Sequence, residues 1–328
     1  LHETGYTTYF FFADCGNKWP GYEDLLGHAV DRHVSGDSSQ VFTINDDRVL
    51  LEALDAVPDA CGPPAFFVFW LMSCHCLGVR DDACCRYKPC ELENTYWTNF
   101  VEGRHEPERL LNRYDNGILQ ADRFTEQILA MLEHKGYADN ALVFVTGDHG
   151  DGFGEHGHYC HSNHVHQEDL CVPLLIGDDP EVRYEGLEFA THLDVAPTIV
   201  ERLGLPIPPF WQGESLLRPR NGRFSYHSTL RGAPRRAVVF RADDGVYKYI
   251  KSHRRAEAFE VDEELYCLST DPGERANRIA SADPRLVRLM RGKLAEFWAP
   301  AGGPAGSPAE TPAETSATAV AQGPEPGL

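Results

Sequence analysis

The chain has 328 residues, enough for one large α/β domain with a small appendage or for two ordinary domains. Thirty Lys and Arg against fifty Asp and Glu give a formal net charge of −20, which argues against broad nucleic-acid binding. An anionic substrate is still allowed, because a bound metal dication reverses the field locally. The longest apolar run, Ala65 to Met72, has eight residues, far below the roughly 18–20 that span a bilayer, so we expect no membrane segment here.

The chain opens with Leu1-His2-Glu3-Thr4, which is neither an initiator Met nor the basic start of a secretory signal. We therefore expect the natural chain to extend upstream of Leu1. A signal for export to the periplasm, the lysosome or the exterior would lie there, so the sequence leaves localisation open.

In the first part of the chain, two apolar runs predict strands. Tyr6 to Ala13 is the first, and Ala65 to Met72 (AFFVFWLM) is the second. Asp46 to Leu54 between them is typical of the opening of an amphipathic helix with Asp at its N-terminus. A strand that is apolar on both faces belongs inside a sheet covered by helices.

The periodicity of apolar residues predicts a long helix from Pro107 to Lys135, with Pro in the first turn and Gly136 after the end. Two further apolar strands follow, Ala141 to Thr146 and Cys171 to Ile176. Helix alternating with apolar strand indicates an α/β fold, with a mostly parallel sheet and helices on both faces.

The character of the sequence changes past residue 217. A helix over Asp194 to Leu203 precedes that change, and the runs 236–241 and 246–251 flank a hairpin signal. Leu265 to Leu268 predicts one more strand, and residues 284–298 predict a closing helix.

These elements predict three parts of the chain. We expect an α/β core over 1–217 and a small C-terminal α+β subdomain with an antiparallel hairpin over 218–299. Residues 300–328 should form a disordered tail, because their composition of Pro, Ala, Gly, Thr, Ser and Glu buries too little.

Six of the ten Cys lie between Cys61 and Cys90. Disulfides of an exported protein, a structural zinc site and free thiols in a reducing compartment all remain open. Spacing alone cannot give a disulfide pairing.

The strongest chemical signal follows the strand that ends at Thr146. Gly147-Asp148-His149-Gly150 places a carboxylate and an imidazole side by side where ligands gather in parallel sheets, at the carboxyl end of a strand. Such a pair suits a divalent metal. The next residues carry five more histidines, which are His156, His158, His161, His164 and His166.

Here the sequence resembles the sulfatase branch of the alkaline-phosphatase superfamily. The resemblance rests on DHGDGFGEHG, on a His eleven residues before the VPLLI strand, and on motifs in the same order around them. These are LHETGYTTYFF, LNRYDNGILQADRFTEQILAML, THLDVAPTIVERLGLP, VYKYI and ELYCLSTDPGERAN, and together they cover roughly residues 1–298.

The resemblance implies a role for four residues in the hydrolysis of an anionic sulfate or phosphate ester. Asp148 and His149 match the metal ligands, and His161 matches a His that contacts the transferred group or the leaving group. His75, after the AFFVFW strand, matches a substrate His of the lipoteichoic-acid synthase and phosphoethanolamine transferase branch. Glu155 and His156 are expected to orient the ligands.

The same resemblance implies a covalent displacement assisted by a divalent metal. The metal would be Ca in a sulfatase, and Mn, Mg or Zn in a phosphotransferase. The chain holds no CxPSR-type nucleophile motif and no early acidic metal ligand, and we expect both upstream of Leu1, so turnover by this chain alone is in doubt.

Two alternatives stand beside a sulfate-ester hydrolase. One is a phosphoryl or phosphoethanolamine transferase of the same superfamily. The other is a non-catalytic, degenerate homologue that binds metal through its His cluster. Substrate specificity is expected to reside in a variable loop, for which residues 80–106 are the candidate.

Overall fold

A computed structural model of the protein describes residues 1–14, 29–36, 46–75, 81–90, 106–219, 222–229, 234–253 and 261–299. The chain divides into two compact units. Unit 1 comprises Leu1–His161 and His166–Pro219, and unit 2 comprises Ser162–Val165 and Arg220–Leu328. The expected tail over 300–328 lies outside the described residues.

Unit 1 contains seven described strands and four described α-helices. The strands are β1 (Thr7–Phe12), β2 (Arg32–Ser35), β3 (Ala65–Trp70), β4 (Val143–Thr146), β5 (Gly152–Phe153), β6 (Tyr159–Cys160) and β7 (Leu174–Gly177). The helices are α2 (Arg48–Asp55), α4 (Pro107–His134), α5 (Gln167–Leu170) and α6 (Val195–Arg202). Short 3-10 turns are η1 (His2–Thr4), η4 (Asp82–Cys84), η5 (Glu155–Gly157), η6 (Leu187–Phe189) and η7 (His192–Asp194).

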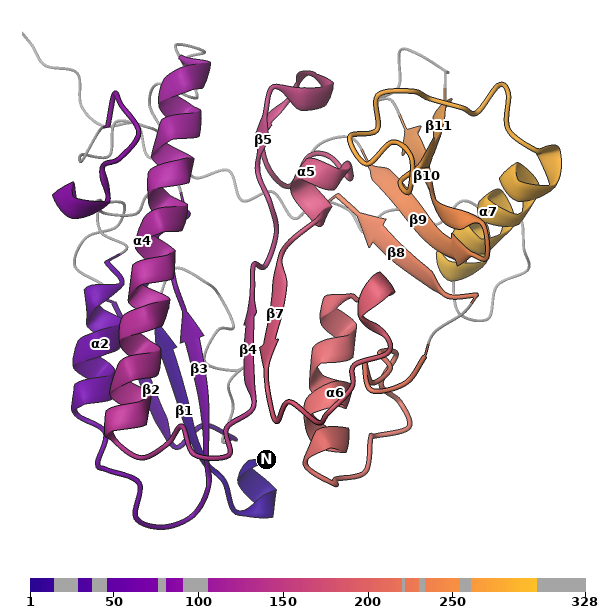
Figure 1. Ribbon diagram of the computed structural model, residues 1–328. Coiled ribbons are helices and arrows are strands. Elements are labelled where there is room, and N and C mark those ends of the chain that lie inside the picture. The colour runs from indigo at the N-terminus through magenta and orange to yellow at the C-terminus, as the bar shows by residue number, and fades with distance from the viewer. Residues whose placement is uncertain are drawn as a thin grey trace, which may run out of the picture. The chain divides into compact units, whose positions relative to one another are not determined.

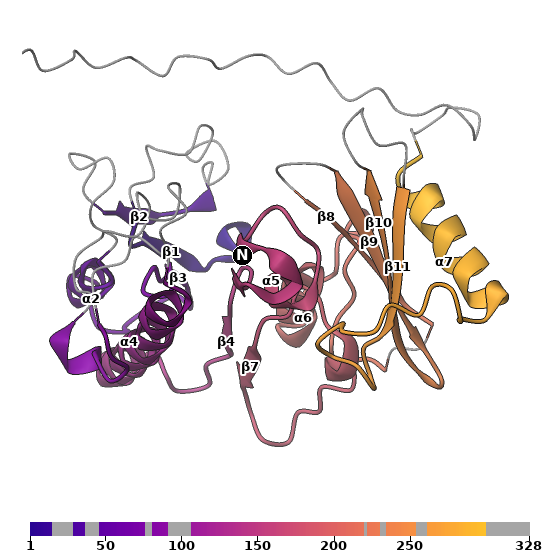
Figure 2. The same cartoon turned by 90° about the horizontal axis from the view of Figure 1, so that it is seen from above.

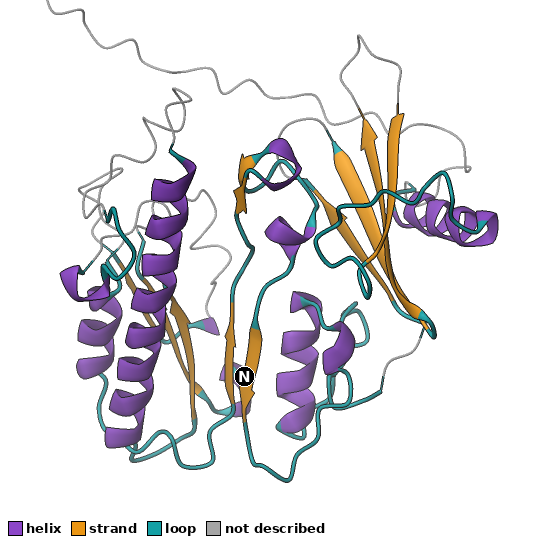
Figure 3. Cartoon of the chain, turned by 45° about the horizontal axis from the view of Figure 1, so that its top comes forward, coloured by secondary structure: helices purple, strands orange, loops and turns teal. Residues whose placement is uncertain are grey.

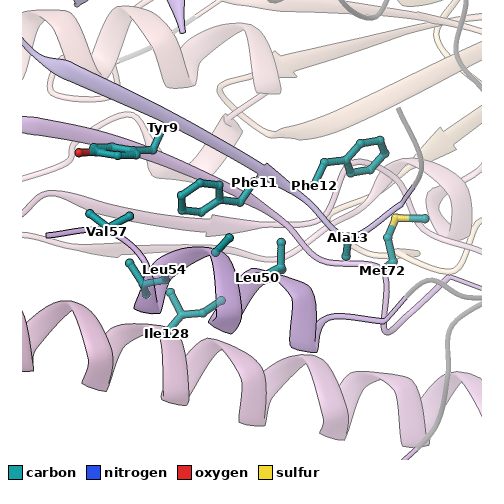
Figure 4. Packing of buried hydrophobic residues seen from close by; sticks show 10 residues of the cluster. Tyr9, Phe11, Phe12, Ala13, Leu50, Leu54, Val57, Met72 and Ile128 are labelled. Atoms are coloured by element: carbon teal, nitrogen blue, oxygen red, sulfur yellow. The ribbon is translucent and has the colours of Figure 1, made fainter. Parts of the chain in front are cut away.

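Strands β1, β2 and β3 form a parallel sheet in the order β2-β1-β3, with α2 and α4 on one face (Figure 1). Alternate residues of β1 point to that face, where Phe11 packs against Leu50 and Leu54 of α2 and near Ile128 of α4 (Figure 4). Phe12 points to the opposite face, and its ring centroid is 4.9 Å from that of Trp70. The expected strands and helices are confirmed here, but the described helices on this sheet lie on one face only.

A buried carboxylate joins the start of α2 to the end of β3. Asp47, the residue before α2, is fully buried and does not cap its own helix. Its carboxylate instead accepts hydrogen bonds from the backbone N–H of Met72 at 2.7 Å and of Ser73 at 3.0 Å, and from the Ser73 hydroxyl. Burial raises the pKa of Asp47 despite these hydrogen bonds. The contact fixes the path of the chain just before His75.

Strands β4 and β7 pair with each other, and they run antiparallel, with Phe144 opposite Ile176. The prediction of a mostly parallel sheet is therefore right for β1, β2 and β3 and wrong for this pair. A parallel pair needs a crossover of a dozen or more residues, usually a helix. The chain between β4 and β7 offers only the short helix α5 and the small β5–β6 hairpin, and it turns straight back (Figure 3).

Unit 2 is an antiparallel sheet in the order β11-β10-β9-β8 with one helix on a face (Figure 2). Its elements are β8 (Phe224–Ser228), β9 (Arg235–Ala242), β10 (Gly245–His253), β11 (Val261–Cys267) and α7 (Pro284–Phe297). Val238, Tyr249 and Met290 fill its core. An ion pair between Lys248 Nζ and a Glu274 carboxylate oxygen, 2.9 Å apart, is fully buried. The expected hairpin over 236–251 is present as β9 and β10.

Candidate active site

The loop after β4 presents Asp148 and His149 together. The His149 backbone N–H donates to Asp148 Oδ1 at 3.0 Å, and His149 Nε2 lies 3.7 Å from Asp148 Oδ2. His149 Nδ1 lies 2.9 Å from the Gly150 carbonyl oxygen. When Nδ1–H donates to that carbonyl, Nε2 carries the lone pair and faces the carboxylate. Both side chains are substantially exposed.

Two further residues complete this cluster from the same loop and from the end of β6. His161 Nδ1 lies 2.7 Å from Asp151 Oδ1, and the ring centroids of His149 and His161 are 3.9 Å apart. Each of His149, Asp151 and His161 offers one ligand atom, and these three atoms all lie within 4.8 Å of one another. The structure thus brings Asp148, His149 and His161 together, and it adds Asp151 to them.

The donor set fits a divalent metal. Two imidazoles and the Asp151 carboxylate converge, with the Asp148 carboxylate beside His149. His149 Nδ1 is engaged by the Gly150 carbonyl, which leaves Nε2 as a ligand. Imidazole ligands suit zinc and other transition metals, whereas calcium takes oxygen ligands.

The Asp151 carboxylate raises the pKa of His161 by its hydrogen bond, against the effect of burial. A raised pKa keeps a larger share of this imidazole protonated near neutral pH. Because Nδ1 is held by Asp151, the other nitrogen of His161 is the one that can transfer a proton or bind an anionic oxygen.

His75 lies close to the same cluster, although it comes from the turn after β3. Its backbone N–H donates to the Met72 carbonyl at 3.0 Å. Burial lowers the pKa of His75, and the charges of His161 and His149 lower it further, while Asp14 and Asp151 raise it. His75 is thus electrostatically coupled to His149, Asp151 and His161 after β4.

Sequence reasoning missed Asp14, Asp151 and Tyr114. Asp14 is buried just past the end of β1, and Asp151 lies three residues after Asp148, so the strand-end rule was a signal for both. Tyr114 lies on α4, with its ring 5.0 Å from that of Phe153. Burial raises the pKa of Tyr114 to about 12, and Cys74, Asp151 and Asp148 contribute. Its predicted place on an apolar helix face gave no hint of this neighbourhood.

The other histidines of this loop have different partners. His156 Nδ1 lies 2.7 Å from Glu168 Oε1, and the His156 and His166 rings stack with centroids 3.9 Å apart. His164 belongs to unit 2, where its Nδ1 contacts the Arg235 guanidinium. Glu155 accepts a hydrogen bond from the Phe153 backbone N–H at 2.5 Å, and the expected role of Glu155 and His156 in orienting the metal ligands stays a prediction.

Gly150 lies between His149 and Asp151 because the backbone there touches the start of α5. Its N–H donates to the Asp169 carbonyl at 2.9 Å. A Cβ at position 150 would lie 2.0 Å from the Glu168 carbonyl oxygen. This close approach sets the direction of both neighbouring side chains.

Part of the predicted variable loop is also described. Residues 81–90 are held on α4 by Asn116, which accepts from the Tyr87 N–H and donates to the Tyr87 carbonyl, both at 2.9 Å. Cys85 and Cys90 form a disulfide in this segment. The other described cysteines, which are Cys61, Cys74, Cys84, Cys160, Cys171 and Cys267, form no disulfide.

None of the helices in the described ranges combines the length and the apolarity needed to cross a bilayer.

Comparison with solved structures supports the fold. A 2-O GAG sulfatase superposes with a TM-score of 0.61 at 17% sequence identity, covering 90% of this chain and 71% of that one. Among characterised sequences, the chain is 28% identical over 197 residues to the multifunctional alkaline phosphatase superfamily protein PehA of Trinickia caryophylli, covering 53% of this chain and 37% of PehA. It is 26% identical over 188 residues to arylsulfatase K of Mus musculus, covering 53% and 33%.

The chain is thus similar in fold to a sulfatase and in sequence to a protein named for the alkaline-phosphatase superfamily. The model of one family within it, Sulfatase, matches residues 1–205, and the chain therefore belongs to the Sulfatase family. The matched segment spans about a third of the length of each of the two curated relatives.

Proposed function

We propose that this chain carries the metal-binding part of a hydrolase of sulfate esters. The observation that carries the proposal is the convergence of Asp148, His149, Asp151 and His161 after β4, inside the segment that the family model matches. A divalent metal held there neutralises the charge of an anionic ester and lowers the pKa of an attacking hydroxyl. Asp148 and His149 are its proposed ligands. The imidazole donor favours zinc over the calcium expected for a sulfatase.

The chain's own residues would bind the ester and handle its proton. His161, oriented by Asp151, is proposed to stabilise the charge that develops on the leaving oxygen or to protonate it. His75, kept mostly neutral by burial, would donate a hydrogen bond to an ester oxygen. Tyr114 stays protonated at neutral pH and is a further donor beside the carboxylates.

The metal assignment is tested with the variant Asp148→Ala/His149→Ala and elemental analysis after dialysis. We expect the variant to lose one equivalent of bound metal per chain. The matched control is His134→Ala/Asp139→Ala, which removes the same residue types from exposed positions at the end of α4 and beyond it. Unchanged metal content in the first variant would show that the ligands are wrong.

The reaction class is tested with aryl sulfate and aryl phosphate esters in the presence of Ca, Mg, Mn or Zn. We expect the chain to bind the sulfate ester only when metal is present, and we expect this binding to weaken in His75→Ala. Metal-dependent turnover is expected in a longer chain that includes the nucleophile. Ester binding that is equal with and without metal, and equal in Asp148→Ala/His149→Ala, would contradict the proposal.

A phosphoryl or phosphoethanolamine transferase is the second candidate. The similarity to PehA, a protein named for the superfamily and not for sulfatases alone, favours it. Preference for the phosphate ester in the same assay would select this candidate.

A further inference from the structure

A second group of metal-type side chains lies between the β5–β6 hairpin and the start of α5, which lie close together in Figure 1. We call His156, His166 and Glu168 the hairpin cluster. Like the group after β4, it offers three ligand atoms within 4.8 Å of one another. Among the described residues, these are the two groups of three side chains whose ligand atoms lie close enough together to hold one metal ion. None of the three residues belongs to the site proposed above.

The hairpin cluster is far less exposed than the Asp148–His149 pair. The exposed fraction is 18% for the His156 side chain, 12% for Glu168 and 4% for His166. The corresponding values are 59% for Asp148 and 39% for His149. Exposed groups of Asp and His often come together without a ligand, but burial of two imidazoles around a carboxylate needs compensation.

A third imidazole, that of His158, lies beside Glu168. His158 Nε2 lies 3.1 Å from Asp169 Oδ1, and both side chains are at least nine-tenths buried. With Nε2–H donating to Asp169, the lone pair of His158 is on Nδ1, which lies 3.8 Å from Glu168 Oε1. Two acceptor atoms that face each other at this distance are suited to a cation between them. A carboxylate that fixes the tautomer of a ligand histidine is the usual arrangement behind protein zinc sites.

The distances and charges also suit zinc. Ligands about 2.0–2.2 Å from a tetrahedral zinc lie roughly 3.3–3.6 Å apart, so the 3.8 Å pair is close to that value and the 2.7 Å His156–Glu168 pair would open by under about 1 Å. Neutral imidazoles with Glu168 and Asp169 carry two negative charges, which a dication balances. Two imidazoles and one carboxylate lie within reach of one ion, and His158, whose Nδ1 lies 3.8 Å from Glu168 Oε1, supplies the fourth ligand of a closed site once its ring moves toward the other two histidines.

We infer that the hairpin cluster, with His158, binds a structural Zn²⁺ or a similar transition-metal ion that ties the β5–β6 hairpin to α5. The bound ion holds residues 155–161 in place, and this stretch ends at His161. The left-handed backbone of His156, with φ of 48°, is what aims its ring at α5. The site is separate from the metal proposed at Asp148 and His149, and neither proposal depends on the other.

The test starts from the full chain with the first cluster disabled, as Asp148→Asn/His149→Ala/His161→Ala. This variant is loaded with Zn²⁺ and dialysed, and zinc is counted by elemental analysis. We expect one zinc per chain to remain. Adding Glu168→Gln/His166→Asn should bring the count to zero, whereas the matched addition Glu155→Gln/His134→Asn should leave it at one.

Two further measurements guard against misfolding and against binding by cysteine. With Co²⁺ in place of Zn²⁺, the background variant should show the d–d absorption of a four-coordinate nitrogen and oxygen site without a thiolate charge-transfer band. Zinc at roughly a hundred times its Kd should raise the Tm of the background variant by about 5 °C or more. In the variant with Glu168→Gln alone, which changes one atom, that rise should vanish.

Retention of no zinc by the background variant would overturn the inference and leave the cluster as a set of His–carboxylate contacts. A thiolate band with Co²⁺, or an unchanged Tm rise in Glu168→Gln, would overturn it as well. If the Asp148→Ala/His149→Ala experiment fails, this test still stands, because the zinc of the hairpin cluster is counted in a variant that already lacks Asp148 and His149.

Discussion

Replacing Asp47 with Ala should destabilise unit 1 more than the loss of an ordinary helix-capping residue. The Asp47 carboxylate is the acceptor for the N–H groups of Met72 and Ser73 and for the Ser73 hydroxyl, all in a buried place. A buried donor left without an acceptor costs about 1–3 kcal/mol. Relief of the burial of the charge offsets part of this loss, and we expect a net decrease in the free energy of unfolding of roughly 2–4 kcal/mol.

Urea unfolding followed by circular dichroism measures the effect. With a slope of about 2 kcal/mol/M, the midpoint should fall by roughly 1–2 M. Asp46→Ala is the matched control, because Asp46 contacts Arg48, whose side chain is 68% exposed, and its loss should cost less than about 1 kcal/mol. Equal midpoints for Asp47→Ala and Asp46→Ala would refute the reasoning that the α2–β3 junction depends on this carboxylate.

Three other predictions follow from buried polar contacts. Although burial raises the pKa of Asp178, hydrogen bonds from Arg202 and Tyr184 hold it below its usual value, so Asp178→Asn should lower the free energy of unfolding by about 1–3 kcal/mol near pH 7. That loss should shrink as the pH falls below the ordinary carboxyl pKa and through the lowered one, and a loss in urea titrations that stays constant over this acid range would contradict this sign. Lys248→Met should cost about 3–5 kcal/mol by stranding Glu274, while Lys248→Met/Glu274→Leu should recover most of that stability, as measured by thermal unfolding; a double variant no more stable than the single one would argue against a stranded charge. Asn116→Ala should speed hydrogen exchange in residues 81–90 by roughly tenfold or more without a matching loss of global stability, and unchanged exchange there would show that other contacts hold the segment.

The sequence predicted where the main elements lie, because fully apolar runs and helical periodicity are local signals. β1, β3 and α4 lie within one or two residues of their predicted bounds. The polar edge strand β2 was not predicted, since Arg32–Ser35 carries no apolar run. The direction of β7 was missed, because strand direction depends on how the intervening chain returns and not on the strand's own residues.

The site was predictable to the extent that chemistry follows strand ends. Asp148 and His149 follow β4 directly, and the structure places His161 and His75 near them. The six histidines divide between two clusters and unit 2. The sequence could not predict this division, because it depends on the tight β5–β6 hairpin and on the position of α5. Tyr114 comes from a helix distant in sequence, and only the folded chain brings it near the carboxylates.

The close approach of Gly150 to the Glu168 carbonyl has a consequence for how this loop can evolve. A side chain at position 150 would push the loop away from α5. Substitution at position 150 therefore cannot be used to change the spacing between residues 149 and 151. At the proposed metal site, a change of metal preference is then confined to exchanges of side chains at 148, 149 and 151 on a constant backbone. A lineage could move from one cation to another there by single substitutions, without having to rebuild the loop.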